Sequence, residues 1–349
     1  DDMLNEVGPE APTESNPAKR IAAALHGRLP VFYGADLMAD VARRFKTPAA
    51  RALLAGCAAH SILPLNFLGT GAMGLVFLAS AHVADWPCAR GGSGAIARAL
   101  VSLFRSLGGE VRTGTWVSSL KDLPPHRVAL FDTSPAALAA IAGDGLPERY
   151  KRALGRFRMG PGLFKLDFAL SGEIPWRDPA LAGASTVHVG GTLEEIAASE
   201  HAMWSGQPHE RPYLIVCQQS RADPERAPAG HHTGYAYCHV PSGHSGDMTE
   251  AVTSQIERFA PGFRDRILAC RPMGPAALEA HNPNLLGGAV TGGAATLWQI
   301  LARPVLRLNP YRTPNPKVLL CSASTPPGGG VHGMCGYWAA QSALSGVLR

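Results

Sequence analysis

Three consecutive glycines between an apolar strand and a helix are the feature that most constrains this chain. Residues 318–321 have the apolar character of a buried strand, Thr325-Pro-Pro-Gly-Gly-Gly330 follows, and apolar residues at helical spacing begin at about Val331. Glycine adopts backbone conformations closed to other residues and lets a ligand lie against the main chain. This order favours an α/β fold with a ligand at the loop. A tight helix-capping loop without a ligand stays open as the alternative.

The loop also suggests what kind of ligand it binds. The backbone N–H groups near Gly330, Val331 and His332 are expected in the first turn of the following helix, where they lack intrahelical partners and the helix dipole is positive. Such an end binds an anion or an electron-rich carbonyl. A flavin needs a donor of this kind at its pyrimidine carbonyl, where negative charge develops on reduction.

The composition is that of a packed globular protein, with 46% apolar and 17% charged residues in a chain of 349. Its formal charge of +5 comes from scattered Lys and Arg residues, so no nucleic-acid partner is expected. Seven cysteines without a Cys-x-x-Cys pair predict free thiols in a reducing compartment. Neither a signal region nor an apolar run of membrane-helix length is found, so the cytoplasm is expected, and peripheral membrane contact stays open.

Hydrophobic periodicity predicts strands and helices along most of the chain. Strand signals in the middle of the chain predict an antiparallel sheet, at residues 163–170, 186–189, 212–217 and 234–240. Amphipathic helices are predicted at 96–107 and 249–259, and strands at 110–117 and 127–131. A helix, a strand and a second helix are predicted at 19–27, 29–34 and 36–45. The sequence therefore predicts a mixed α/β fold.

Two motifs suggest other chemistry and are set aside. Gly69-Thr-Gly-Ala-Met-Gly74 fits the dinucleotide fingerprint, but no strand precedes it and no acidic residue stands at the required distance. We expect helix there. The histidines at 231, 232, 239 and 244 tempt a metal assignment, but His239 alternates with Tyr237 on a predicted strand while the others fall in loops, so no metal site is expected.

Several ordered motifs resemble the phytoene dehydrogenase-like flavoproteins, of the pyridine nucleotide-disulfide oxidoreductase domain protein 2 type. The resemblance runs from about residue 42 to the end. It rests on the segments 86–93, 107–111, 130–135, 159–162, 190–195, 237–240 and 282–284 and on the C-terminal loop. It implies a bound FAD and the dehydrogenation or desaturation of an apolar small molecule, such as a carotenoid-like or other lipid-like compound. It also implies an FAD/NAD(P)-binding Rossmann-like domain with an antiparallel-sheet substrate domain.

The resemblance divides the chain and assigns residues to the cofactor. Residues 48–135 and 286–349 are implied to build parts of the FAD-binding domain, and 136–285 the substrate domain. Gly91, Gly92 and Ser93 are implied to line the cofactor cleft, Val117 the adenosine half, and Thr133 and Ser134 the phosphates or ring system. The C-terminal residues implied to bind the cofactor are Ser324, Thr325, Pro326, Pro327, Gly328, Gly329, Gly330, Val331, His332, Gly333 and Met334. His332 is the candidate for tuning the flavin or handling a proton, with a loop-packing role equally open.

The first 47 residues follow a different pattern. Asn16-Pro-Ala-Lys19, Gly27-Arg-Leu-Pro-Val-Phe-Tyr-Gly34 and Ala42-Arg-Arg-Phe-Lys-Thr47 resemble a fragment of the sugar-isomerase domain of bifunctional phosphoglucose/phosphomannose isomerases. The flavoprotein family's own dinucleotide fingerprint has no counterpart in this chain, so the incomplete cofactor domain suggests a truncated or chimeric protein. Whether the chain is an enzyme is thus left open between an FAD-dependent oxidoreductase, a protein without a catalytic cofactor and, with least support, a phosphosugar isomerase.

Overall fold

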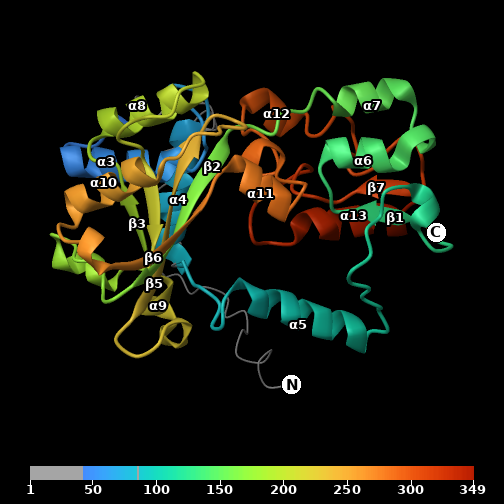
Figure 1. Ribbon diagram of the computed structural model, residues 1–349. Coiled ribbons are helices and arrows are strands. Elements are labelled where there is room, and N and C mark those ends of the chain that lie inside the picture. The colour runs from blue at the N-terminus through green and yellow to red at the C-terminus, as the bar shows by residue number, and fades with distance from the viewer. Residues whose placement is uncertain (1–41, 85) are drawn as a thin grey trace, which may run out of the picture.

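A computed structural model describes residues 42–84 and 86–349 of the chain (Figure 1). It contains a five-stranded antiparallel sheet in the order β3-β4-β5-β2-β6 and a parallel pair of β1 with β7. The predicted mixed α/β fold is confirmed. The elements predicted at 19–27 and 29–34, and most of the isomerase-like segment, lie outside the described residues.

The strands confirm most of the sequence-based assignments. They are β1 Ala129–Phe131, β2 Gly162–Leu170, β3 Thr186–Val189, β4 Leu214–Cys217, β5 His232–Val240, β6 Ile267–Met273 and β7 Val318–Leu320. The antiparallel sheet predicted from the middle of the chain is confirmed by β2 to β5. Its edge strand β6 was not predicted, because it contains Pro272 and most of its side chains are exposed, so it lacks the alternation of a half-buried strand.

The helices surround both sheets. They are α3 Pro48–Ala59, α4 Thr70–Ala84, α5 Ser93–Ser106, α6 Pro135–Ala142, α7 Glu148–Leu154, α8 Leu193–Trp204, α9 Gln219–Ala222, α10 Thr249–Phe259, α11 Pro275–His281, α12 Leu297–Leu301 and α13 Met334–Leu344. The fingerprint-like segment 69–74 begins α4, which confirms the expected helix. Within the described part of the chain, no helix combines the length and the apolar character needed to cross a bilayer.

The antiparallel sheet has an apolar core on each face. Alternate side chains of β2, among them Leu166, pack with Ile256 of α10 and with Phe263. Leu54 of α3 and Ile196 of α8 belong to the core that covers the opposite face. In Figure 1 these helices flank the antiparallel sheet, while α6, α7 and α13 surround the parallel pair. The antiparallel sheet and the parallel pair therefore pack in separate hydrophobic cores within one chain.

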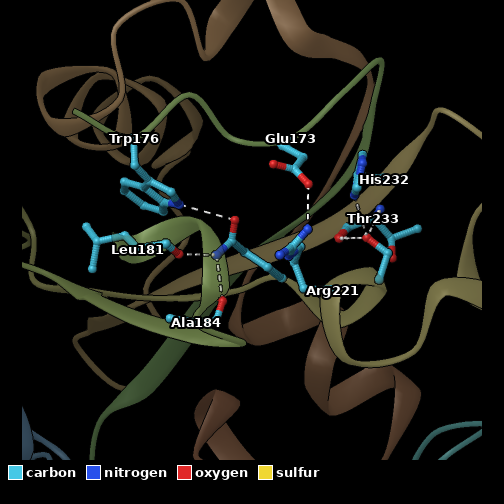
Figure 2. Close-up of polar contacts among 9 residues, drawn as sticks. Glu173, Trp176, Leu181, Ala184, Arg221, His232 and Thr233 are labelled. Carbon is cyan, nitrogen blue, oxygen red and sulfur yellow. Dashed lines mark hydrogen bonds and ion pairs between the residues drawn. The ribbon is translucent and has the colours of Figure 1, made fainter. Parts of the chain in front are cut away.

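Hydrogen bonds through buried Gln218 close one end of the antiparallel sheet. Its amide accepts from the Trp176 indole at 3.1 Å and donates to the carbonyl oxygens of Leu181 and Ala184 at 3.2 and 2.7 Å. Figure 2 shows Trp176, Leu181 and Ala184 converging on this amide. A buried amide satisfied in this way fixes the chain between β2 and β3 against the end of β4.

The prediction of a strand at Glu110–Val117 is wrong. Residues 110–117 are irregular, and no strand among the described residues lies beside them to complete a ladder. The preceding helix α5 forms as predicted, but none of its residues is buried, and Leu100 on its apolar face is 62% exposed. Alternation predicts a strand only where a neighbouring strand supplies hydrogen-bond partners. The other predicted strand of this region, at 127–131, does pair and forms β1.

The core position of Leu166 gives a direct test of this packing. Leu166 is fully buried on β2, whereas Leu268 on β6 is 58% exposed. We expect Leu166→Ala to lower the free energy of unfolding by about 2–5 kcal/mol, because it leaves a cavity in the core. Leu268→Ala, the matched control, is expected to change it by less than about 0.5 kcal/mol. Urea titration of both variants measures the difference, and equal losses would contradict the described core.

Candidate functional site

The parallel pairing of β1 with β7 brings two distant parts of the chain to one sheet edge. Phe131 pairs with Leu320, and the Cys321 N–H donates to the Phe131 carbonyl at 2.9 Å. Because the strands run in the same direction, residues 132–134 and 321–325 both leave from their carboxyl ends. Ligands of open α/β sheets bind at this edge. The sequence-predicted residues Thr133, Ser134, Ser324 and Thr325 belong to these two segments.

On the β1 side, Ser134 is held by structural contacts. Its hydroxyl accepts from the Ala137 N–H at 3.2 Å and so caps α6, while its own N–H donates to Asn284 Oδ1 at 2.8 Å. Only 3% of Ser134 is exposed. Asp132 precedes it, and partial burial raises the pKa of this carboxyl above its ordinary value. The segment is thus rigid where it leaves the strand.

A cavity of about 530 Å³ lies beside β1. Its lining comes from the segments 115–117, 123–133 and 283–284 and from Ala137 and Ile141 of α6. Val117 and Thr133, which the family resemblance implies for different parts of one cofactor, both line this cavity. It is large enough for a small organic group, since ligand pockets begin at about 300 Å³.

On the β7 side, the inner part of the glycine loop is closed by its own hydrogen bonds. The Thr325 hydroxyl donates to the Ser322 carbonyl at 2.7 Å, and the Ser324 hydroxyl donates to the Gly292 carbonyl at 2.8 Å. The thiol of Cys335, on α13, donates to the Gly328 carbonyl at 3.4 Å. Ser324, Thr325 and Gly328 are buried. These residues therefore shape the loop from within.

The outer part of the loop is open. Pro327, Gly329, Gly330, Val331, His332 and Gly333 are exposed, whereas Pro326 and Met334 are partly covered. The helix begins at Met334, three residues later than predicted, so the N–H groups of residues 330–332 belong to a turn ahead of it. An exposed glycine backbone allows close approach of a ligand.

His332 has an observed structural role in this turn. Its Nδ1 accepts from the Met334 N–H at 3.0 Å, which satisfies one of the donors that a helix leaves unpaired at its start. This contact supports the loop-packing interpretation of His332. Its exposed ring also leaves Nε2 directed away from that bond, and flavin tuning or proton handling by His332 stays a prediction.

Arg303 is a residue of this loop that the sequence did not indicate. It is 6% exposed, and its Nη2 donates to the carbonyl oxygens of Gly292 and Ala323 at 3.1 and 3.0 Å. Burial lowers the pKa of the guanidinium from its ordinary value. A Cβ on Gly328 would lie 2.9 Å from Nη1, so glycine there makes room for the side chain. An isolated arginine carries no spacing signal that would have revealed this role.

The structure does not bring Gly91, Gly92 and Ser93 to the same edge. The Gly91 N–H donates to Asp223 at 2.7 Å, and Gly92 lies against the guanidinium of Arg226. Both partners belong to the segment after α9, beside the antiparallel sheet. The implied role of these three residues in lining a cofactor cleft stays a prediction.

A separate, partly buried cluster contains His60, at the end of α3, and His188, on β3 of the antiparallel sheet. His60 and His188 are linked by their Nε2 atoms at 2.9 Å, and His60 stacks on Phe77 with ring centroids 4.5 Å apart. Burial lowers the pKa of His60 to about 3 and that of His188 to about 4. For His60, the neighbouring His188 lowers the pKa further. Both rings are therefore neutral at physiological pH.

His239, one of the histidines considered for a metal, lies on β5 in the same region. Its Nδ1 is 2.8 Å from Oε2 of fully buried Glu200. Across residues 42–84 and 86–349, no three His, Cys, Asp or Glu side chains are grouped as a metal site would require. His239 is therefore part of a buried polar pair.

Comparison with solved structures places the fold among those of oxidoreductases. An oxidoreductase from Methanosarcina mazei superposes with a TM-score of 0.54 at 14% identity, covering 97% of this chain and 72% of that one. Putrescine oxidase, solved with bound putrescine, gives a TM-score of 0.54 at 13% identity, covering 98% and 78%. At this level of identity the likeness concerns the fold.

Sequence relatives are more specific. The chain is 27% identical over 295 residues to pyridine nucleotide-disulfide oxidoreductase domain-containing protein 2 of Rattus norvegicus and, equally, of Mus musculus. The alignment covers 73% of this chain and spans about half, 50%, of those relatives. Residues 14–52 match the family model of the bacterial phospho-glucose isomerase C-terminal SIS domain. The resemblance to this oxidoreductase type and the isomerase-like segment therefore each have a counterpart among known proteins, and the phytoene dehydrogenase-like character stays a prediction.

Gly328 tests whether the loop depends on the buried guanidinium. Its φ is +108°, and a Cβ there would meet Arg303 Nη1. We expect Gly328→Ala to lower the free energy of unfolding by about 1–3 kcal/mol, because it adds backbone strain to a steric conflict. Gly336, on α13, has no atom within 4 Å of a Cβ placed on it. Gly336→Ala is expected to leave stability unchanged or raise it by about 0.5–1 kcal/mol. A neutral effect at Gly328 in urea titrations would refute this account of the loop.

The histidine cluster predicts loss of stability in acid. In the unfolded chain His60 and His188 take up protons below their ordinary pKa of 6.5, but in the folded protein only near 3 and 4. The unfolded state thus binds more protons, and stability falls as the pH drops from 6.5 toward 4. Between pH 7 and 5 we expect a loss on the order of 2 kcal/mol per histidine.

The variant His188→Gln isolates this contribution. Urea titrations at pH 7 and pH 5 should show a smaller acid-induced loss in the variant than in the parent, whatever its stability at pH 7. His126→Gln, which changes an exposed histidine, is the control and should keep the parent's pH dependence. An unchanged pH dependence in His188→Gln would show that the His60–His188 pair does not govern acid stability.

Proposed function

We propose that this chain is an FAD-dependent oxidoreductase, acting as a dehydrogenase or desaturase. The observation that carries the proposal is the meeting of two segments at the carboxyl ends of β1 and β7: one borders the cavity beside β1, and the other exposes a glycine backbone. This is the edge at which α/β folds bind nucleotide cofactors. The likeness to oxidoreductases in fold and in sequence supports the same assignment.

The residues present suit the two ends of a flavin nucleotide. Val117 would hold the adenosine half in the cavity beside β1, where Thr133 would lie near the phosphates or ring system. The exposed backbone of Gly329, Gly330 and Val331 would border the ring system. Bound flavin supplies hydride acceptance from a C–H bond. The protein would supply the position of the ring, since Ser324, Arg303 and Cys335 hold the loop in place.

The substrate we propose is an apolar small molecule. A second cavity of about 500 Å³ is lined mostly by apolar residues, among them Met159, Met203, Trp204 and Ala294, with Arg158 and Ser242 as its polar lining. Ala294 is close in sequence to Gly292, whose carbonyl accepts hydrogen bonds from Ser324 and Arg303 of the glycine-loop region. The cavity is thus connected to the loop through residues 292–294. Thioether and indole side chains favour contact with hydrocarbon over contact with charged groups.

A protein without a catalytic cofactor is the second candidate. The exposed apolar face of α5 and the irregular segment 110–117 favour it, because a cofactor domain normally covers such a helix with its sheet. Phosphosugar isomerase activity is supported only by the match of residues 14–52, and most of that segment lies outside the described residues.

Flavin binding distinguishes the candidates. Purified protein is expected to be yellow, with the visible absorption of oxidised flavin, or to become so after incubation with FAD and gel filtration. Ala137→Trp, which fills the cavity from α6, is expected to weaken FAD binding at least tenfold, the equivalent of about 1.4 kcal/mol. Ala140 lies on the same helix with its side chain exposed, so Ala140→Trp is the matched control and should bind FAD like the parent.

Two results would count against the proposal. A colourless protein that takes up no FAD would favour the second candidate. Equal FAD affinity of the parent and Ala137→Trp would mean that the cavity beside β1 is not part of the cofactor site, even if flavin binds. Circular dichroism of both variants shows whether the fold is retained.

A further inference from the structure

An arginine-lined hollow lies on the surface beside α7, away from the cavity at β1. Arg149, Arg152, Arg156 and Arg307 surround a volume of about 770 Å³. No acidic residue lines it, and the one acidic side chain of α7, Glu148, is paired with Lys151 at 3.0 Å. Arg307 also lies over the ring of Tyr150, 5.6 Å from its centroid. Four cations around one hollow create a positive potential that attracts an anionic partner.

One exposed leucine lines this hollow, and other exposed apolar side chains lie close to it in the sequence. Leu306, which lines it, is 67% exposed, and Leu308 is fully exposed. Nearby on α12, Trp298 and Leu301 are each 69% exposed. Single exposed leucines are common on proteins, but Leu306 and Leu308 flank Arg307 of the hollow, and exposed apolar groups beside clustered cations suggest an interaction site.

Hydrogen bonds between buried Gln299 and the backbone of Arg158 place α12 beside the segment that follows α7. Gln299 of α12 donates through Nε2 to the Arg158 carbonyl at 2.8 Å and accepts from the Arg158 N–H at 2.9 Å. The chain that links α12 to Arg307 therefore runs beside the segment that follows α7. In Figure 1, α12 and α7 lie along the same side of the molecule. We define the basic-apolar face as Arg149, Arg152, Arg156, Arg307, Leu306 and Leu308.

We propose that the basic-apolar face docks on the surface of an anionic lipid bilayer. Arginines satisfy headgroup phosphates, which carry the negative charge, and the protruding Leu306 and Leu308 enter the boundary between headgroups and acyl chains. A free phosphate would account for the arginines alone. A soluble acidic protein would not require Leu306 and Leu308, on either side of Arg307, to stand out into solvent beside the cations. An anionic bilayer provides phosphates for the arginines and an apolar layer for the two leucines.

Vesicle cosedimentation tests this with the full chain. Phosphatidylcholine vesicles containing about a third phosphatidylglycerol should bind the protein, pure phosphatidylcholine vesicles should bind it at least tenfold more weakly, and raised salt should release it. Arg152→Glu/Arg156→Glu is expected to weaken binding to the anionic vesicles at least tenfold. Arg105→Glu/Arg177→Glu reverses two exposed arginines elsewhere on the surface and should have less than a threefold effect.

Separate measurements test the role of the leucines and the alternative that the arginines bind a free anion. Leu306→Ser/Leu308→Ser should weaken vesicle binding at least fivefold without changing the net charge, while Val76→Ser/Leu268→Ser, at other exposed positions, should not. The proposal is overturned if anionic vesicles do not bind the parent, or if either face variant binds like its control. Calorimetric binding of inorganic phosphate that is lost in Arg152→Glu/Arg156→Glu, with no binding to vesicles, would instead assign the arginines to a soluble anion. These outcomes do not depend on whether the protein binds FAD.

Discussion

The pairing of β1 with β7 is the interaction on which the candidate site depends. Each strand contributes three residues, and such a short two-stranded ladder is marginal by itself. Its stability comes from the apolar residues beneath it, in which Phe131 and Leu320 of the strands pack with Leu138 of α6 and Leu154 of α7. Burial of this core therefore holds together segments far apart in the sequence. Without it, the two parts of the candidate site would have no common edge.

Glycines and a buried cation then determine the shape of the loop after β7. Arg303 binds carbonyl oxygens from the two chain segments that carry Gly292 and Ala323, and Cys335 ties the loop to α13. A buried guanidinium is costly unless its donors are satisfied. In this case backbone carbonyls supply partners for Nη2, while Nε has no hydrogen-bond partner among the described residues. The loop is therefore rigid on its inner side and accessible on its outer side.

The sequence predicted those elements whose signals are local. The strand signals of β2 to β5 and the helical spacing in α10 were sufficient, because each of these elements buries the apolar residues that its pattern indicates. Glu110–Val117 alternates like a strand but has no neighbouring strand among the described residues, so it stays irregular. The glycine loop was located correctly, yet its helix begins at Met334 because Gly333 has a φ of +63° and His332 caps the turn. Arg303 and the His60–His188 pair depend on tertiary contacts, which no spacing encodes.

The molecule leaves apolar surface exposed in two different settings, and the difference lies in what surrounds it. On α5, Leu100 and Leu103 form the apolar face of an amphipathic helix with no described partner, beside a segment that alternates without pairing. Both features are those of an element whose packing partner is a sheet. Leu306 and Leu308 instead stand on an irregular segment among arginines, where no regular element is left unpaired. A packed protein partner replaces water around apolar groups, but it leaves clustered cations without counter-charges unless it is acidic. An anionic bilayer covers the apolar groups and also supplies the negative charges. The surroundings of each apolar surface thus favour a protein layer on α5 and a lipid layer beside α7.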